Sequence, residues 1–208
     1  MTTNDELTTN DELTPASVLS TRTPPVTGPE EEVESALAVR LARVVESAVE
    51  VLGVDGVGLM LFDQHDAPRT AGFTSVPASA LEQVQTEIGE GPGIDASRRA
   101  ETIAVTDLAE ATDYARLWDR VQALGVRAVL ASPVWVWGSV IGNLNAVRSH
   151  PHRWTETEIR ANEAYAKVIG VTFDLAAQTV DTARSTVPPE PGQRPDLADA
   201  VDGPDRRP

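Results

Sequence analysis

The sequence contains no cysteine among its 208 residues, and this absence narrows the chemistry open to it. Without thiols the chain cannot form disulfides, bind a metal through thiolates or use a cysteine nucleophile. Aromatic residues are also scarce, at 4%. The apolar content of 41% is nevertheless sufficient for one domain of ordinary size with its own core.

The sequence also has few basic residues. Lys167 is the single lysine, and the formal net charge is −15. Because an acidic surface repels phosphate backbones, we expect no direct binding to nucleic acid. No stretch approaches the ~20 apolar residues of a membrane span, and no apolar run follows a basic start. These features predict a cytoplasmic protein that does not enter a membrane.

Both ends of the sequence have the composition of disordered segments. Residues 1–29 carry a direct repeat, TTNDEL followed by TTNDEL, and then several prolines. Residues 185–208 are rich in proline. Low complexity and the scarcity of apolar residues predict disorder in both tails. The folded domain is therefore expected over residues 30–184.

Hydrophobic periodicity between the tails predicts an alternation of helices and strands. Apolar residues at three- and four-residue spacing predict long helices over 30–52 and from Thr155 past Val180, where Thr155 and Glu158 have capping-box spacing. Three shorter helices are expected: over 77–88, from Ile94, and over 111–124. Short apolar runs predict strands over 54–62, 69–74, 102–106, 126–136 and 139–147, the last two as a hairpin. This order favours an α+β fold with a mostly antiparallel sheet.

The segment GEGPGIDASR, residues 89–98, suggests the rim of a binding site. Backbone N–H groups from Gly93 through Ile94 to Asp95 could hold an anion, with Arg98 or Arg99 as a fork for a carboxylate or phosphate. The alternative is a connecting loop in which Asp95 caps the next helix and the arginines are solvated.

The hairpin over 126–147 combines apolar residues with two asparagines. Strand alternation places Asn143 and Asn145 on one face, where buried amides need partners. We hypothesise that this face, with Trp135 from the hairpin and with Tyr114 and Trp118 from the preceding helix, lines a small-molecule pocket. The alternative is a packed core in which the asparagines bond to the backbone.

Two apolar stripes run along the last helix. One contains Ile169, Phe173 and Val180, and the other contains Val168 and Leu175. Since one stripe can cover the sheet, the other needs a second surface, and we expect a homodimer in which the first and last helices form a bundle. The alternative is one broad apolar face within a monomer. The expected dimer interface comprises Leu37, Leu41, Ile169, Phe173 and Val180.

Few side chains suggest catalysis. His150 and His152 lie in a loop without a third metal ligand at helical spacing, and Asp107 is better explained as a cap before Leu108. No Ser-His-Asp pattern stands out. We therefore expect neither a metal site nor enzyme activity.

Several segments together resemble the GAF domain family: VLGVDGVGLMLFD, LEQVQTEIGEGPGIDASR, VTDL and LGVRAVLASPVWVWGSVIGNLNAV, followed by the closing helix. The similarity covers about residues 30 to 183 and is closest to actinobacterial GAF domains that are often joined to an RNA-binding ANTAR domain. The resemblance implies an antiparallel sheet with the terminal helices on one face and a small-molecule pocket on the other. It also implies sensory or regulatory activity and dimerisation through the terminal helices.

Departures from the family limit what the resemblance implies. Similar sequences often have a cysteine where this chain has Gly93, and the cysteines of phytochromes and of free methionine sulfoxide reductases are missing. The residue set of cyclic-nucleotide GAF domains is not found, and no ANTAR segment follows the last helix. We expect a stand-alone regulatory domain that binds an unidentified small molecule and signals through a dimer to a partner protein. The alternative is a ligand-free scaffold for dimerisation or protein interaction.

Overall fold

A five-stranded sheet lies at the centre of the protein in a computed structural model that describes residues 29–186. The strand order is β2-β1-β5-β4-β3, and every neighbouring pair is antiparallel. The predicted tails lie almost entirely outside the described residues. The strands are β1 (Gly56–Phe62), β2 (Pro68–Phe73), β3 (Ile103–Val105), β4 (Ala128–Val136) and β5 (Ser139–Arg148).

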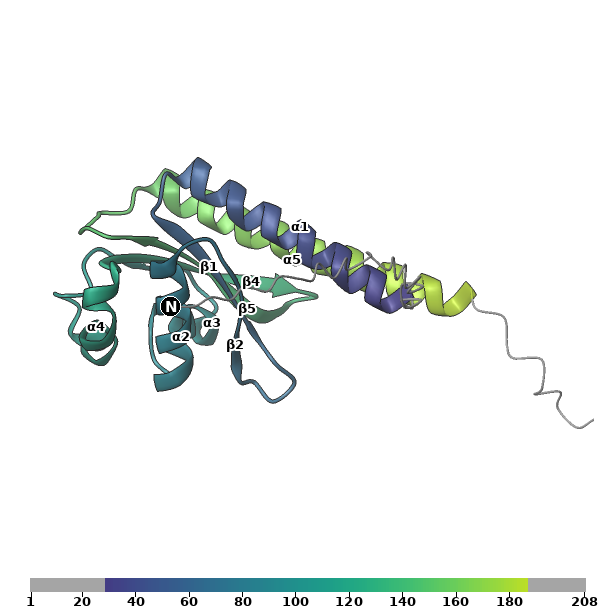
Figure 1. Cartoon of the computed structure of the whole chain (residues 1–208), viewed down its shortest axis with the longest axis horizontal. Helices are drawn as coiled ribbons and strands as arrows, with labels where there is room; N and C mark the ends of the chain where they lie inside the picture. The colour runs from purple at the N-terminus through teal and green to yellow at the C-terminus, as the bar shows by residue number, and fades with distance from the viewer. Residues whose placement is uncertain (1–28, 187–208) are drawn as a thin grey trace, which may run out of the picture.

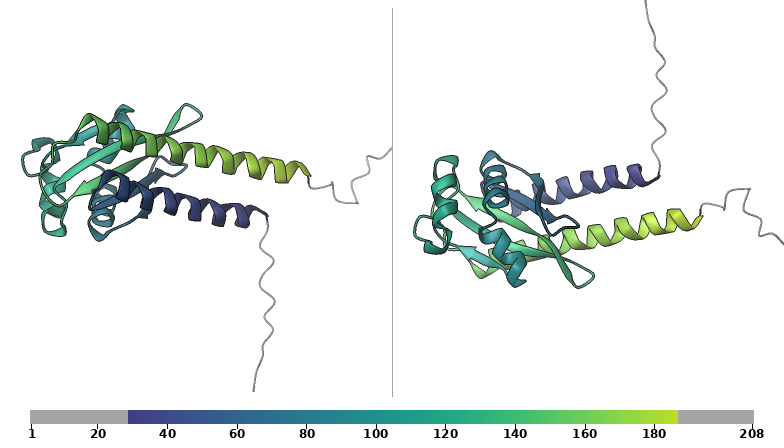
Figure 2. Two further views of the ribbon diagram at one scale, coloured as in Figure 1. Left: turned by 90° about the horizontal axis from the view of Figure 1, so that it is seen from above. Right: turned by 90° about the horizontal axis from the view of Figure 1, so that it is seen from below.

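Helices cover both faces of the sheet (Figure 1). The long helices α1 (Pro29–Leu52) and α5 (Glu156–Thr186) lie side by side on one face, and both extend well beyond the sheet (Figure 2). The other face carries α2 (Val76–Ile88), α3 (Pro92–Arg99) and α4 (Ala115–Val121). The α+β architecture expected from the periodicity is confirmed.

Strand alternation divides the core into two clusters, one on each face. Along β4, Leu130 and Val134 belong to the cluster under α1 and α5, whereas Val129 belongs to the cluster under α2 and α4. Along β5, Leu144 and Val147 divide in the same way. This alternation follows from the two-residue period of a strand, and it directs Asn143 and Asn145 to the face that carries α2 and α3.

Local signals account for most helix boundaries. The predicted capping box is present in α5, since the Glu158 N–H donates to Thr155 Oγ1 and the Thr155 N–H donates to Glu158 Oε2. Asp107 also caps as expected, because its Oδ1 accepts the Ala109 N–H at 3.0 Å. Ser75, which was not identified as a cap, accepts the Ala78 N–H at the start of α2.

Two expected boundaries were wrong. Helix α3 begins at Pro92 rather than at Ile94, because Gly91 adopts a φ of 144° and Pro92 supplies the fixed φ of a first helical residue. Asp95 therefore lies inside the helix and is not its cap. The helix expected over 111–124 is divided into two 3₁₀ turns, Thr112–Tyr114 and Gln122–Leu124, on either side of α4.

Candidate functional site

A cluster of polar side chains lies buried between the sheet, α2 and α3. Asn145 Nδ2 on β5 donates to Glu82 Oε1 on α2 and to Asn143 Oδ1, each at 2.7 Å. Gln85 Oε1, one turn further along α2, accepts the Gly93 N–H of α3 at 2.7 Å. Glu82, Gln85, Asn143 and Asn145 are each 0% exposed. Four polar side chains thus occupy a position where a small domain ordinarily places apolar ones.

Glycines leave the space that these side chains occupy. A Cβ on Gly58 of β1 would lie 2.2 Å from Glu82 Oε1, and a Cβ on Gly93 would lie 2.5 Å from Asn143 Oδ1. Helix α3 thus packs its backbone directly against the two asparagines. It lies between two residues with positive φ, Gly91 and Ala100 at 58°. The cluster is therefore closed by one short helix that is bounded by unusual backbone conformations.

Three atoms of the cluster have no hydrogen-bond partner in the structure: Glu82 Oε2, Gln85 Nε2 and Asn145 Oδ1. A buried polar atom left unpaired costs about 1–3 kcal/mol. Burial raises the pKa of Glu82 to about 8, and the Asn145 hydrogen bond only partly opposes this effect. The site therefore combines a carboxyl that is mainly neutral at pH 7 with further unused hydrogen-bonding capacity.

The structure brings several of the predicted pocket residues to this region. Gly93, Asn143 and Asn145 belong to the cluster itself. Asn143 Nδ2 also donates to Ser97 Oγ at 2.9 Å, which connects the cluster to a surface hollow of about 330 Å³. Ile94 and Arg98 line this hollow together with Phe62, Asp66, Ser97 and Val140.

The predicted anion fork is not formed. Arg98 and Arg99 both pair with Asp95, at 3.5 and 3.2 Å, so each guanidinium already has a carboxylate beside it. The Tyr114 hydroxyl donates to the Asp95 carboxylate at 3.0 Å. This hydrogen bond connects the residue before α4 to α3. Asp95 is thus a connecting residue, and negative charge already occupies the position expected for an anion.

The two predicted pocket tryptophans do not reach the cluster. Trp118 packs against the core under α2 and α4, where the Arg127 guanidinium lies 5.1 Å from its ring centroid. Trp135 is 44% exposed and lines a hollow with the α3–β3 connection and α5. The pairing register between β4 and β5 shifts between Val134 and Trp135, and this irregularity ends the simple alternation on which the expectation rested.

Glu82 and Gln85 were missed at the sequence level. The apolar residues Leu81, Val84 and Ile88 define one face of the helix predicted over 77–88, and they draw attention away from the polar residues beside them. The buried positions of α2 also include Ala78, Glu82 and Gln85. The spacing Ala78, Leu81, Glu82, Gln85 follows the i, i+3, i+4, i+7 pattern of one helix face, and it could have identified both polar residues as buried.

A second hollow lies on the opposite side of the sheet. It has a volume of about 460 Å³ and runs between α1 and the β1–β2 hairpin, with Leu37, Leu41, Leu59, Gly72 and Phe173 among its lining residues. No group of three or more His, Asp or Glu side chains within residues 29–186 is arranged to hold a metal ion. Within the same residues, no helix has the length and apolarity needed to cross a membrane.

The expected dimer interface needs correction. Ile169 is 0% exposed and belongs to the monomer's own core, so it has no surface to offer a partner. Leu41 and Phe173 are also partly buried against that core. Leu37 and Val180 are half-buried. The other stripe of α5 remains at the surface: Val168 is 48%, Val171 48% and Leu175 51% exposed.

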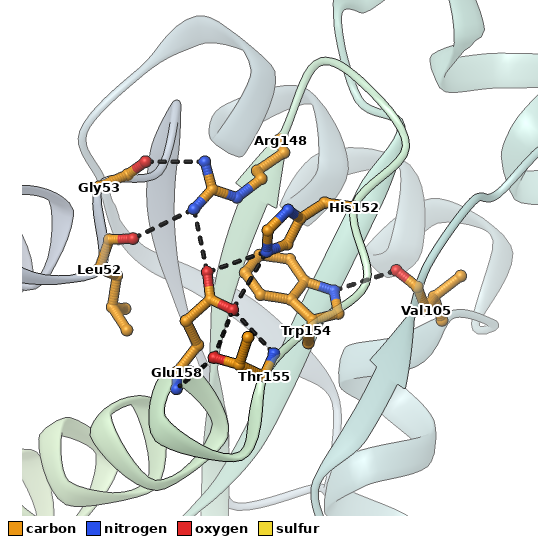
Figure 3. Close-up of polar contacts among 8 residues, drawn as sticks. All are labelled: Leu52, Gly53, Val105, Arg148, His152, Trp154, Thr155 and Glu158. Atoms are coloured by element: carbon orange, nitrogen blue, oxygen red, sulfur yellow. Dashed lines mark hydrogen bonds and ion pairs between the residues drawn. The ribbon is translucent and has the colours of Figure 1, made fainter.

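A polar junction ties α1 to α5 at one end of the sheet (Figure 3). Arg148, the last residue of β5, donates to the Leu52 and Gly53 carbonyls at the end of α1 and to Glu158 Oε1 at 3.1 Å. Glu158 also contacts His152 Nε2 at 2.9 Å. Arg148 and Glu158 therefore add a polar link between the end of β5 and both long helices to the apolar packing of those helices on the sheet.

This junction yields a pH-dependent prediction. Burial alone would raise the pKa of Glu158, but hydrogen bonds from Thr155, His152 and Arg148 lower it to about 2. A carboxyl whose pKa is lower in the folded protein than in the unfolded chain stabilises the fold at pH values above the unfolded pKa. This contribution is lost as the pH falls through the folded pKa. We expect Glu158→Gln to reduce the free energy of unfolding by about 2 kcal/mol at pH 7, and the difference from wild type to shrink between pH 4.5 and pH 2.

Urea unfolding at a series of pH values measures this difference. Glu156→Gln is the matched control, because Glu156 is exposed in the same first turn of α5 and its ion pair within residues 29–186 is with exposed Arg160. A loss for Glu158→Gln that is no larger than for Glu156→Gln, or that is constant from pH 7 to pH 2, would contradict the prediction.

Comparisons with known proteins agree with this architecture. The family model described as "GAF domain" matches residues 36–173. The GAF domain of an Acinetobacter phosphoenolpyruvate-protein phosphotransferase superposes with a TM-score of 0.55 at 15% identity, covering 72% of this chain and 90% of that one. The photoproduct state of GAF3 from Slr1393 of Synechocystis gives 0.58 at 20% identity, with 72% and 98% coverage.

An enzyme of the same fold is also similar. The free methionine-R-sulfoxide reductase from Neisseria meningitidis, solved in complex with its substrate, gives a TM-score of 0.53 at 20% identity and covers 72% of this chain and 88% of that one. At these identities the likeness concerns the fold alone. No curated protein is similar enough in sequence to count as a match. The family model spans well over half of the residues, and the chain therefore belongs to the GAF domain family.

Proposed function

We propose that this protein is a regulatory GAF domain that binds a small polar molecule between α3 and the sheet. The observation that carries the proposal is the set of three unpartnered atoms, on Glu82, Gln85 and Asn145, within one fully buried cluster. A bound molecule that satisfies these atoms would recover several kcal/mol of desolvation cost. The hollow that Ser97 lines is joined to the cluster by the Ser97–Asn143 hydrogen bond, and a ligand would enter from it by displacing α3.

Native mass spectrometry of gently purified protein tests the proposal, with the denatured chain as the mass reference. We expect the folded protein to carry an additional small-molecule mass. Asn145→Leu should lose this mass while keeping the wild-type circular dichroism spectrum. A bare protein that also shows no thermal shift with pools of polar metabolites would overturn the proposal.

The output of such a domain is proposed to pass through α1 and α5 to a second copy and from there to a partner protein. Val168, Val171 and Leu175 form an exposed stripe with a spacing of three and four residues, which is the pattern of a helix–helix seam. Helix α1 contributes exposed Val39 and Val51. Apolar side chains exposed in a row are typical of a surface that a partner covers.

Leu175→Glu tests this interface. We expect the wild type to be a dimer by light scattering after size exclusion, and the variant to dissociate with a Kd at least ten times higher, because a carboxylate would be buried in an apolar seam. Gln178→Glu is the control, since it adds the same charge at an exposed polar position of the same helix. A Leu175→Glu dimer as stable as the control would exclude this stripe as the interface.

A ligand-free scaffold is the second candidate function, and one observation favours it. The backbone at Gly93 packs so closely against Asn143 and Asn145 that the cluster is closed in this structure. A scaffold would dimerise through α5 without any bound molecule. The mass measurement and the Leu175→Glu measurement together distinguish the two functions, because only the regulatory domain requires a positive result in both.

A further inference from the structure

The unsatisfied atoms of the buried cluster specify what kind of molecule would complete it. Two of the three, Glu82 Oε2 and Asn145 Oδ1, are acceptors when Glu82 is ionised, and only Gln85 Nε2 is a donor. The Glu82 carboxyl receives one hydrogen bond, from Asn145, and appears in no ion pair among residues 29–186. When Glu82 is ionised, Glu82 Oε2 and Asn145 Oδ1 therefore lack an N–H or O–H donor, and no positive charge faces the carboxylate among residues 29–186.

The groups placed against Glu82 are neutral. Gly58 on β1 lies against the carboxyl and Asn145 on β5 donates to it, while Asn143 and Gly93 contact Asn145. The charged residues of α3 instead pair with one another: Asp95 contacts Arg98 and Arg99. An ionised Glu82 would repel an anionic ligand, so an anion could bind only while the carboxyl is neutral. A cationic ligand would instead supply the positive charge that an ionised Glu82 lacks in this cluster.

We propose, on the basis of the function proposed above, that the ligand is a small organic cation whose guanidinium or ammonium group donates to Glu82 and Asn145. Its N–H groups would fill the acceptor positions Glu82 Oε2 and Asn145 Oδ1, and a polar atom elsewhere in the molecule would accept from Gln85 Nε2. Helix α3 moves about Gly91 and Ala100 to admit it. This assignment replaces the anion site expected from the glycine-rich segment.

Cation binding is coupled to a proton. Since the pKa of Glu82 in the unliganded fold is about 8, the carboxyl is mostly protonated at pH 7 and must release that proton to pair with a cation. Affinity should consequently increase by up to tenfold for each pH unit between pH 6 and pH 8. A neutral ligand would show no such dependence, and an anion would show the opposite one.

Titration of the ¹⁵N-labelled full chain with methylguanidinium, methylammonium, acetate and inorganic phosphate tests the proposal. We expect one or both cations to shift the Gly93 amide and the Asn145 side-chain amide resonances, with a Kd that falls about tenfold from pH 6 to pH 7. Glu82→Gln should weaken this binding at least tenfold. Glu87→Gln should leave it unchanged, because Glu87 lies exposed on the same helix.

The outcomes separate this proposal from the proposed function. Shifts at the cluster with acetate or phosphate but not with the cations, or a cation Kd that is equal at pH 6 and pH 8, would overturn the cation assignment. So would an anionic or neutral molecule found bound by native mass spectrometry, which would leave the regulatory function intact. A protein without any bound mass and without shifts for any of the four probes would overturn both.

Discussion

Glu82→Gln is expected to make the protein more stable than the wild type, by an amount that grows with pH. Burial disfavours the charged form of Glu82 and raises its folded pKa from the ordinary value of 4.5 to about 8. Between these values the unfolded chain has lost the proton that the folded chain keeps. The wild type therefore loses stability as the pH rises, at about 1.4 kcal/mol per unit, whereas glutamine stays neutral.

Over the whole interval from pH 4.5 to pH 8 the difference between the two proteins should reach about 5 kcal/mol. Urea unfolding at half-unit steps of pH measures it, because subtracting the wild-type curve removes the titration of all other groups. Glu87→Gln serves as the control, and its difference should stay within about 1 kcal/mol, because the Glu87 ion pair with Arg120 is exposed. A Glu82→Gln difference that does not change with pH would show that Glu82 titrates at its ordinary value in the folded protein.

Gly170→Val is expected to reduce the free energy of unfolding by about 3 kcal/mol or more. Gly170 lies where α5 crosses β4, and a Cβ at this position would lie 2.1 Å from the Trp135 carbonyl oxygen. That oxygen belongs to the backbone of β4 and cannot turn aside as a flexible side chain can. The helix would have to move away from the sheet and loosen the packing of Ile169 and Ala166.

Ala164→Val provides the matched control for this variant. Ala164 is exposed on the same helix, so the substitution introduces the same β-branched side chain without a neighbour to displace. Its cost should not exceed about 0.7 kcal/mol, the range of helix propensity among ordinary residues. Thermal or urea unfolding followed by tryptophan fluorescence compares the two. Equal losses would mean that α5 does not depend on the close approach at Gly170.

Parts of the site that depend on one strand were predictable, and parts that depend on several elements were not. Asn143 and Asn145 were assigned to one buried face because strand alternation is a local property. Trp135 was misplaced because the register shift beside it arises from pairing with β5. The sequence left Asp95 open between a helix cap and an anion-site rim, and neither its contacts with Arg98 and Arg99 nor its contact with Tyr114 can be foreseen from a turn-like sequence.

The order and type of the main elements followed from the sequence by itself, because hydrophobic period, glycine and capping residues act over only a few neighbouring residues. The double stripe of the last helix was also evident in this way. Tertiary structure alone decided that Glu82 meets Asn145, 63 positions away, and that the Ile169 stripe faces inward while the Leu175 stripe stays exposed. Burial and pairing between distant residues depend on how the helices pack on the sheet. That packing determines the charge state of Glu82 and which atoms of the candidate site have no hydrogen-bond partner.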